Sequence, residues 1–171
     1  HNSQLMNPEQ LDVFHSVNDS VRECEAGDQS AAQSGIAHRS RTCALMAAAG
    51  TGKTLVAKTL MCAVFARGGT ALACATSGIA ATLLPGGQTC NRVFGTPVPV
   101  QQNSTSMTGL QARRAEQLRA ASLTLCDESL MAHHHSMTVG HRLQSELRGH
   151  ESESPHSPAF GGVPTLAMGD I

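Results

Sequence analysis

Ala47-Ala48-Ala49-Gly50-Thr51-Gly52-Lys53-Thr54 is the stretch of this chain that decides the fold. It matches the phosphate-binding pattern G-x-x-x-x-G-K-[ST] at every defined position except the first, where Ala47 replaces glycine. An apolar run at 42–46 precedes the stretch and a helical pattern at 54–65 follows it. In this strand–loop–helix setting, backbone N–H groups and the helix dipole favour an anion. The stretch therefore predicts a loop that binds a nucleoside triphosphate.

The residues of this loop have distinct expected roles. The backbone from Ala49 to Gly52 would surround the phosphates, and the Lys53 ammonium would reach the β- and γ-phosphates. The Thr54 hydroxyl would ligate Mg²⁺. Ala47 leaves two alternatives open: a positive φ at this position would cost alanine about 1–2 kcal/mol, whereas a negative φ would cost little. A glycine-rich turn that merely caps a helix is the simpler alternative, and the strand–loop–helix setting disfavours it.

A second chemical element is the pair of carboxylates Asp127-Glu128, which directly follows the apolar run at 123–126. Asp127 is expected to hold magnesium, and Glu128 is expected to orient or deprotonate the attacking water. The carboxyl ends of parallel strands meet at one edge of a sheet, so both elements should converge in one crevice. The sequence thus predicts a catalytic set of Lys53, Asp127 and Glu128.

The rest of the chain supports an α/β domain, because apolar runs alternate with helical patterns. We expect strands at 42–46, 70–75, 123–126 and 163–168, all buried. We expect helices at 8–21, 54–65, 79–84, 110–121 and 137–147, with a helical turn at 89–94. Residues 24–40 are polar and aperiodic, and they predict a loop or an insertion.

Composition sets broader limits. The 171 residues suit one domain. The near balance of 12 basic and 13 acidic residues does not indicate nucleic-acid binding, and it leaves a local basic groove open. None of the six cysteines forms a C-x-x-C pair and most lie in apolar runs, which predicts buried free thiols and a reducing compartment. No stretch is long and apolar enough to span a membrane.

Several motifs, in order along nearly the whole chain, resemble those of the Pif family of superfamily-one DNA helicases, and most closely its plant and Helitron-type branch. The matching segments correspond, in order, to the family's Q motif, motif I, motif Ia, motif II and the approach to motif III. They are Asn7-Pro8-Glu9-Gln10, Ala49–Thr54, Thr76–Ala81 with Leu84–Thr89, Asp127–Met131, and Pro158–Gly162 with Gly169-Asp170. Departures from the family are Ala47, Asn91 and Ser129.

The resemblance implies a three-layer P-loop NTPase domain of the RecA-like type, with a mainly parallel sheet. It implies that the side chain of Gln10 reads adenine and that the cofactors are ATP and Mg²⁺. It also implies contacts to single-stranded DNA or DNA junctions, through the residues Thr76, Ser77, Gly78, Thr89 and Phe94.

For the parent protein, the resemblance implies ATP-dependent DNA unwinding with 5′→3′ polarity, in DNA repair or recombination, and a nuclear or mitochondrial location. The first residue is His1, and the chain reaches Ile171 within the third motif. We therefore expect residues 1–171 to be part of a first motor domain, with the second RecA-like domain elsewhere in the same polypeptide. Such a piece should bind nucleotide but hydrolyse it slowly, because charge stabilisation comes from the second domain.

The sequence also allows other interpretations. A degenerate, non-catalytic nucleotide-binding remnant is the main alternative, motivated by Ala47 and Asn91. A different P-loop enzyme such as a kinase would need an acceptor site, and none is evident. His133-His134-His135 invites a zinc site, but three consecutive side chains are not expected to point one way. Arg113, Arg114 and Arg119 are expected to form a solvated helix face rather than a DNA contact.

Overall fold

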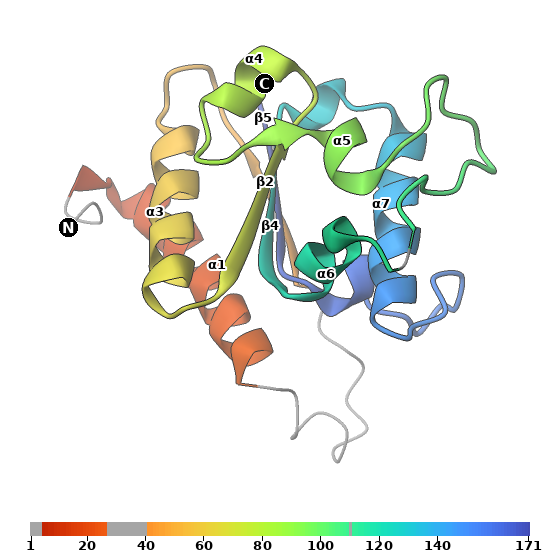
Figure 1. Cartoon of the computed structure of the whole chain (residues 1–171). Coiled ribbons are helices and arrows are strands. Elements are labelled where there is room, and N and C mark those ends of the chain that lie inside the picture. Colours follow the sequence, from red (N-terminus) through yellow and green to blue (C-terminus); the bar gives the residue numbers. More distant parts are fainter. Residues whose placement is uncertain (1–4, 27–40, 110) are drawn as a thin grey trace.

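The computed structural model describes residues 5–26, 41–109 and 111–171, and Figure 1 shows a central sheet with helices on both faces. The strands are β1 (Thr42–Met46), β2 (Thr70–Ala75), β3 (Gln88–Thr89), β4 (Ala121–Asp127) and β5 (Thr165–Gly169). They pair in the order β1-β5-β4-β2-β3, and each pair is parallel. The predicted three-layer α/β fold with a parallel sheet is confirmed.

Helices cover both faces of the sheet (Figure 1). On the first face lie α1 (Pro8–Glu25) and α3 (Lys53–Ala66). On the second lie α5 (Cys90–Phe94), α6 (Arg113–Arg119) and α7 (His134–Leu147). The short helix α4 (Gly78–Thr82) and the 3-10 turn η2 (Ser129–Met131) follow the carboxyl ends of β2 and β4, and a second 3-10 turn, η3 (Ala159–Gly162), precedes β5.

The start of α1 is fixed by a capping box. The Asn7 side chain accepts a hydrogen bond from the Gln10 amide at 2.8 Å, and the Asn7 amide donates to the Gln10 side chain at 2.9 Å. Pro8 occupies the first helical position, where its missing N–H costs nothing. These local signals explain why the helix begins where the sequence predicts it.

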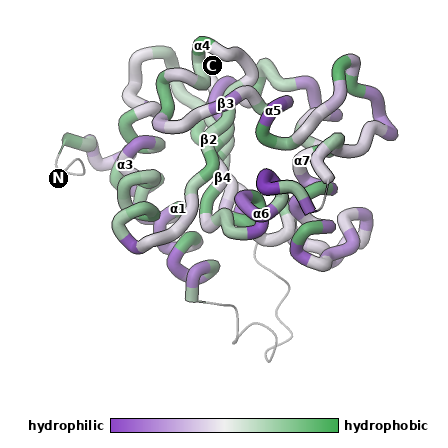
Figure 2. Tube along the Cα trace, in the orientation of Figure 1, coloured by the Kyte–Doolittle hydropathy of each residue, from purple (hydrophilic) through white to green (hydrophobic). Residues whose placement is uncertain are grey.

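Two apolar cores lie on the two faces of the sheet. The larger core joins α1 and α3 to the central strands, and its most buried members are aliphatic or sulfur-containing, such as Val21, Leu60, Met61, Leu125 and Met168. The smaller core lies under α5, α6 and α7 and contains Phe94. Apolar residues accordingly line α3 and the strands in Figure 2. Aliphatic side chains and methionines make up most of these cores in a chain with no Trp, no Tyr and four Phe.

Some predicted boundaries are wrong. Helix α1 continues to Glu25, so the loop expected at 24–40 begins later, and its residues 27–40 lie outside the described part of the chain. Strand β1 is not buried: Thr42 and Ala44 are exposed, because β1 pairs only with β5 among the described strands. The two-residue strand β3 was missed, since it is too short to produce an alternating pattern.

Phe94 packs closely against α7. Its ring is fully buried, and a Cβ added at Gly140 would lie 3.0 Å from two of its ring atoms. This contact holds α5 against α7 behind the carboxyl edge of β2.

Replacing Gly140 with alanine should therefore destabilise the chain, although the same change in a helix normally adds up to about 1 kcal/mol. The buried Phe94 ring cannot move aside, so overpacking should cost about 1–3 kcal/mol. Urea unfolding of the variant measures the net effect. The double variant Gly140→Ala/Phe94→Leu should recover part of the loss. A Gly140→Ala variant more stable than the parent would contradict the close packing described here.

Candidate functional site

The phosphate-binding loop leaves β1 and enters α3 through two glycines in the left-handed region. Gly50 has φ +78°, and Gly52, which precedes the first helical residue, has φ +86°. Ala47 does not have a positive φ; in the described part of the chain the non-glycine residues that do are Glu128 and Phe160. The low-cost alternative for Ala47 therefore holds, and the absence of the first glycine does not strain the loop.

Lys53 is held inside the loop by three oxygen partners. Its Nζ donates hydrogen bonds to the carbonyl oxygens of Ala47 and Ala48, at 2.7 and 2.9 Å. It also forms an ion pair with Asp170 at 2.5 Å. The Lys53 side chain is 10% exposed, whereas that of Asp170 is 63% exposed. The ammonium thus lies where an anion at the start of α3 would meet it.

Gln10 links α1 to the phosphate loop. Its Nε2 donates a hydrogen bond to the Thr51 carbonyl at 2.7 Å, while its Oε1 completes the α1 capping box. A pocket of about 330 Å³ opens between these elements, and Asn7, Gln10, Thr51 and Lys53 are among its lining residues. Its size and its position beside the loop suit the base and sugar of a nucleotide.

Asp127 ends β4, two strands away from β1. Burial raises the pKa of its carboxyl group, and the neighbouring carboxylates of Glu128 and Asp170 raise it further. The Glu128 amide, which donates a hydrogen bond to Asp127 Oδ1 at 2.9 Å, and the Lys53 ammonium oppose this shift. Asp127 and Asp170, which both interact with the Lys53 ammonium, offer carboxylate oxygens of the kind that a hard divalent cation binds. Thr54, the other expected metal ligand, is the second residue of α3 and is partly buried.

Glu128 is directed away from Asp127 and toward β2. Its Oε2 accepts hydrogen bonds from the hydroxyls of Thr76 and Ser77, at 3.1 and 3.0 Å. Its backbone is in the left-handed region at φ +52°, which is uncommon for a residue other than glycine, asparagine or aspartate. Glu128, the expected catalytic base, is therefore hydrogen-bonded to two residues expected to contact DNA. The sequence did not predict this link.

Of the remaining residues predicted to contact DNA, Gly78 and Thr89 lie at helix starts, whereas Phe94 is buried. Gly78 begins α4 with open space around its α-carbon, and Thr89 caps α5 by accepting a hydrogen bond from the Arg92 amide at 3.4 Å. Phe94 does not fit the expectation that it stacks against a base, because its ring is fully buried between α5 and α7. Helix α6, which carries Arg113, Arg114 and Arg119, ends just before β4 begins and so lies at the amino ends of the strands, away from the candidate site (Figure 1).

Two residues of the site were missed. Asp170 pairs with Lys53, and the Ser129 hydroxyl donates a hydrogen bond to the Met168 carbonyl at 2.8 Å, joining η2 to the end of β5. Asp170 had a detectable signal, since it is an acidic residue directly after an apolar strand. Ser129 had none, because its partner is a backbone oxygen distant in sequence.

The histidine run differs from expectation. One ring nitrogen from each of His133, His134 and His135 lies within 4.8 Å of the others, because His133 precedes α7 and turns its ring over the helix start. The expectation that the three side chains do not gather is therefore wrong, although the rings of His133 and His134 are exposed. Separately, none of the helices in the described ranges has the length and apolarity required to cross a bilayer.

A glycine loop feeding a helix, a lysine within it and an acidic pair at the end of a nearby parallel strand define a P-loop NTPase domain of the RecA-like type. Within that class the chain belongs to the PIF1-like helicase family, whose sequence model matches residues 5–171. No curated protein sequence matches the chain.

Solved structures of the family share this fold. A Bacteroides Pif1 bound to single-stranded DNA is 26% identical with a TM-score of 0.62, and the alignment covers 75% of this chain and 28% of that one. A Bacteroides Pif1 in complex with ADP-AlF4 is 22% identical, with a TM-score of 0.68 and coverage of 96% and 32%. The Candida albicans Pif1 helicase is 18% identical, with a TM-score of 0.68 and coverage of 96% and 32%. The chain thus spans about a third of these proteins.

The raised pKa of Asp127 gives a stability test. A carboxyl group whose pKa is raised by folding contributes stability that is fully present below its unfolded-state pKa, near 3.8, and is lost as the pH rises through the folded-state pKa. Asp127→Asn keeps the acceptor oxygen and cannot ionise. Its melting temperature should exceed that of the parent chain at neutral pH, and the difference should vanish in acid.

The matched control for this test is Asp12→Asn, at an exposed position of α1. It should show no comparable gain at neutral pH. Equal pH dependence of Asp127→Asn and the parent chain would contradict the assigned burial penalty. Thermal unfolding by circular dichroism across the pH range measures all three proteins.

Proposed function

We propose that this chain is a nucleotide-binding motor domain that binds ATP–Mg²⁺ and, within a longer polypeptide, couples ATP hydrolysis to 5′→3′ unwinding of DNA. The observation that carries the proposal is the convergence of Gln10, the loop 50–54 and Asp127-Glu128 at one edge of a parallel sheet. Family membership over residues 5–171 supports the same activity.

The nucleotide would lie along the start of α3, with its base in the pocket beside Gln10. Lys53 would exchange the carbonyls of Ala47 and Ala48 for phosphate oxygens, a gain because a doubly charged partner replaces neutral ones. Release of Asp170 from Lys53 would accompany this exchange. A Bacteroides Pif1 in complex with ADP-AlF4 has the same fold, which supports an anion at this site.

Thr54 and Asp127 are the proposed ligands of magnesium. When bound, the ion supplies charge neutralisation for the phosphates and for the transition state. The cluster fits it, because a cation would offset the burial penalty that raises the pKa of Asp127. Glu128 would then orient or deprotonate the attacking water.

Single-stranded DNA is the proposed polymer partner, as it is for a Bacteroides Pif1. Thr76, Ser77, Gly78 and Thr89 would contact its backbone from the loops that follow β2 and β3. The Thr76 and Ser77 hydroxyls currently hold Glu128. A DNA phosphate would compete for these donors, so its arrival would free Glu128 to act on water and would couple DNA binding to hydrolysis.

Nucleotide binding is tested by Lys53→Ala. Removing a hydrogen bond to a charged group costs about 1.5–3 kcal/mol, so the Kd for a fluorescent ATP analogue with Mg²⁺ should rise about 10- to 100-fold. Lys58→Ala, on the same helix, is the control and should bind like the parent chain. Equal and negligible binding by all three proteins would favour the alternative of a degenerate, non-catalytic remnant.

Coupling between DNA and Glu128 is tested by Thr76→Val, which removes one donor to Glu128 and leaves the Ser77 cap of α4 in place. Single-turnover ATP hydrolysis without DNA should rise about 3- to 10-fold, the value of one hydrogen bond, while stimulation by oligo-dT should fall.

The control for coupling is Thr82→Val on α4, whose hydroxyl donates to the Ile79 carbonyl instead. It should leave the basal rate and the stimulation unchanged. A Thr76→Val variant with the parent's basal rate and stimulation would rule out the competition between DNA and Glu128, without affecting the nucleotide site.

A further inference from the structure

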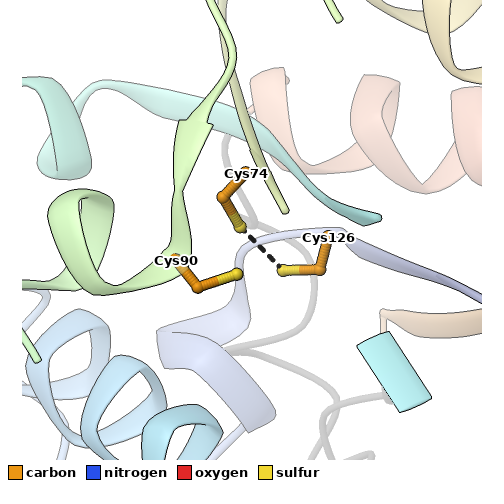
Figure 3. Close-up of side chains that lie close together, drawn as sticks. All are labelled: Cys74, Cys90 and Cys126. Carbon is orange, nitrogen blue, oxygen red and sulfur yellow. Dashed lines mark hydrogen bonds between the residues drawn. The ribbon is translucent and has the colours of Figure 1, made fainter. Parts of the chain in front are cut away.

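Three cysteines from different elements meet behind the candidate site (Figure 3). Cys74 lies in β2, Cys126 lies in β4, and Cys90 begins α5. Cys74 and Cys126 are register partners on adjacent parallel strands, and their sulfurs are 3.2 Å apart. All three sulfurs lie within 4.8 Å of one another. The parallel register and the turn into α5 therefore build a three-sulfur cluster from residues far apart in sequence.

The cluster is dry and has three donors. Cys74, Cys90 and Cys126 are 0%, 3% and 1% exposed. Within the described ranges, no fourth His, Cys, Asp or Glu donor atom joins them at this distance. Structural zinc sites almost always have four ligands in tetrahedral geometry, so three thiols without a fourth ligand match zinc poorly. The donor set instead suits a soft ion that is satisfied by three sulfurs.

Charge narrows the choice of ion. Three thiolates around a monovalent or divalent ion would leave a net negative charge in an apolar core, and buried charge is costly. A trivalent ion gives a neutral complex.

The three thiols differ in how readily they ionise. Hydrogen bonds to Cys126 and Cys90, together with burial, raise the pKa of the Cys74 thiol, whereas hydrogen bonds from Cys126 and Cys74 lower the pKa of Cys90. Among the three sulfurs, the surroundings therefore favour the thiolate form at Cys90.

A pocket at the surface gives small solutes access to Cys90. A pocket of about 240 Å³ is lined by Thr76, Cys90, Asn91, Val98 and Met131, among other residues. Cys90 is the cysteine of the cluster that lines it. A small neutral solute could therefore meet Cys90 first and then the two thiols behind it.

We propose that Cys74, Cys90 and Cys126 form a binding site for trivalent arsenic, taken up from arsenite as a neutral three-sulfur complex. Arsenous acid, As(OH)₃, is small and uncharged at neutral pH. Three S–H and three As–O bonds break, three As–S bonds form, and each thiol proton leaves with a hydroxide as water. No oxidation or reduction takes place, so no co-reactant is required.

The site has a consequence for the chemistry beside it. Cys126 directly precedes Asp127, Cys74 lies two residues before Thr76, and Cys90 directly follows Thr89. Bonding the three sulfurs to one atom would cross-link β2, β4 and α5. The cross-link would stabilise the folded chain and fix the spacing between the strand ends that carry Asp127 and Thr76.

The test uses the 171-residue chain, reduced with a phosphine that offers no competing thiol. Arsenite is titrated and the product is examined by mass spectrometry under non-denaturing conditions. We expect one arsenic atom per chain, with the mass of three lost protons, and a rise in melting temperature. Arsenite is a selective probe here, because the imidazoles of His133–His135 do not compete for it.

Cys90→Ser and Cys126→Ser should each weaken arsenite binding at least 10-fold, whereas Cys62→Ser, at an exposed cysteine, should not change it. Circular dichroism establishes that each variant is folded, and two independent variants keep the test valid if one is not. Absence of arsenic from the parent chain would overturn the proposal. So would binding that survives both substitutions, or displacement of arsenic by equimolar Zn²⁺.

Discussion

The parallel pairing of β1, β5 and β4 is the constraint on which the candidate chemistry depends. Met46 pairs with Gly169 and Cys126 pairs with Ala167, so the three strands end at nearly the same level. Lys53 and Asp170 follow β1 and β5, and Asp127 is the last residue of β4. Because the strands run in one direction, their polar ends collect at one edge while their apolar lengths remain in the core. A shift of one strand by two residues would leave the same side chains on each face of the sheet, but it would separate these charged groups.

That arrangement brings several carboxylates close together, and separate partners for each of them offset the repulsion. Glu128 and Asp170 both raise the pKa of Asp127, yet each of the three carboxylates has a different partner. Asp170 binds the Lys53 ammonium, Glu128 binds two hydroxyls, and Asp127 accepts one amide while burial disfavours its ionised form. Carboxyl groups whose pKa is shifted by burial and by neighbouring charges are common at functional sites. The positive φ of Glu128 belongs to the same pattern, since strain persists where the surroundings determine it.

The sequence predicted what local patterns encode. The loop 47–54, the capped start of α1, the strand at 70–75 and the acidic strand end are all signalled by neighbours within a few residues, and the structure places them as expected. Predictions that depended on tertiary contacts were less accurate. Phe94 was assigned to DNA because exposure cannot be deduced from a lone aromatic residue, and Gly140, which makes room for it, lies in another helix.

The same limit applies to the site itself. The bond from Glu128 to Thr76 and Ser77 crosses about fifty residues of sequence and involves no recognisable motif spacing. The cysteines at 74, 90 and 126 were interpreted as separate buried thiols, because no C-x-x-C pair relates them. Only the register of β2 against β4 brings two of them together. Sheet register is a global property, so it was outside the reach of local sequence patterns.

The Gln10 side chain has an effect that extends along α1. It bonds both to the cap of its own helix and to the Thr51 carbonyl, so the first turn of α1 and the phosphate loop share one side chain. Local opening of either segment must break a bond that orders the other. Fraying of α1 and ordering of the loop are therefore thermodynamically linked. A ligand held by the loop would slow amide hydrogen exchange in a helix whose backbone it does not touch.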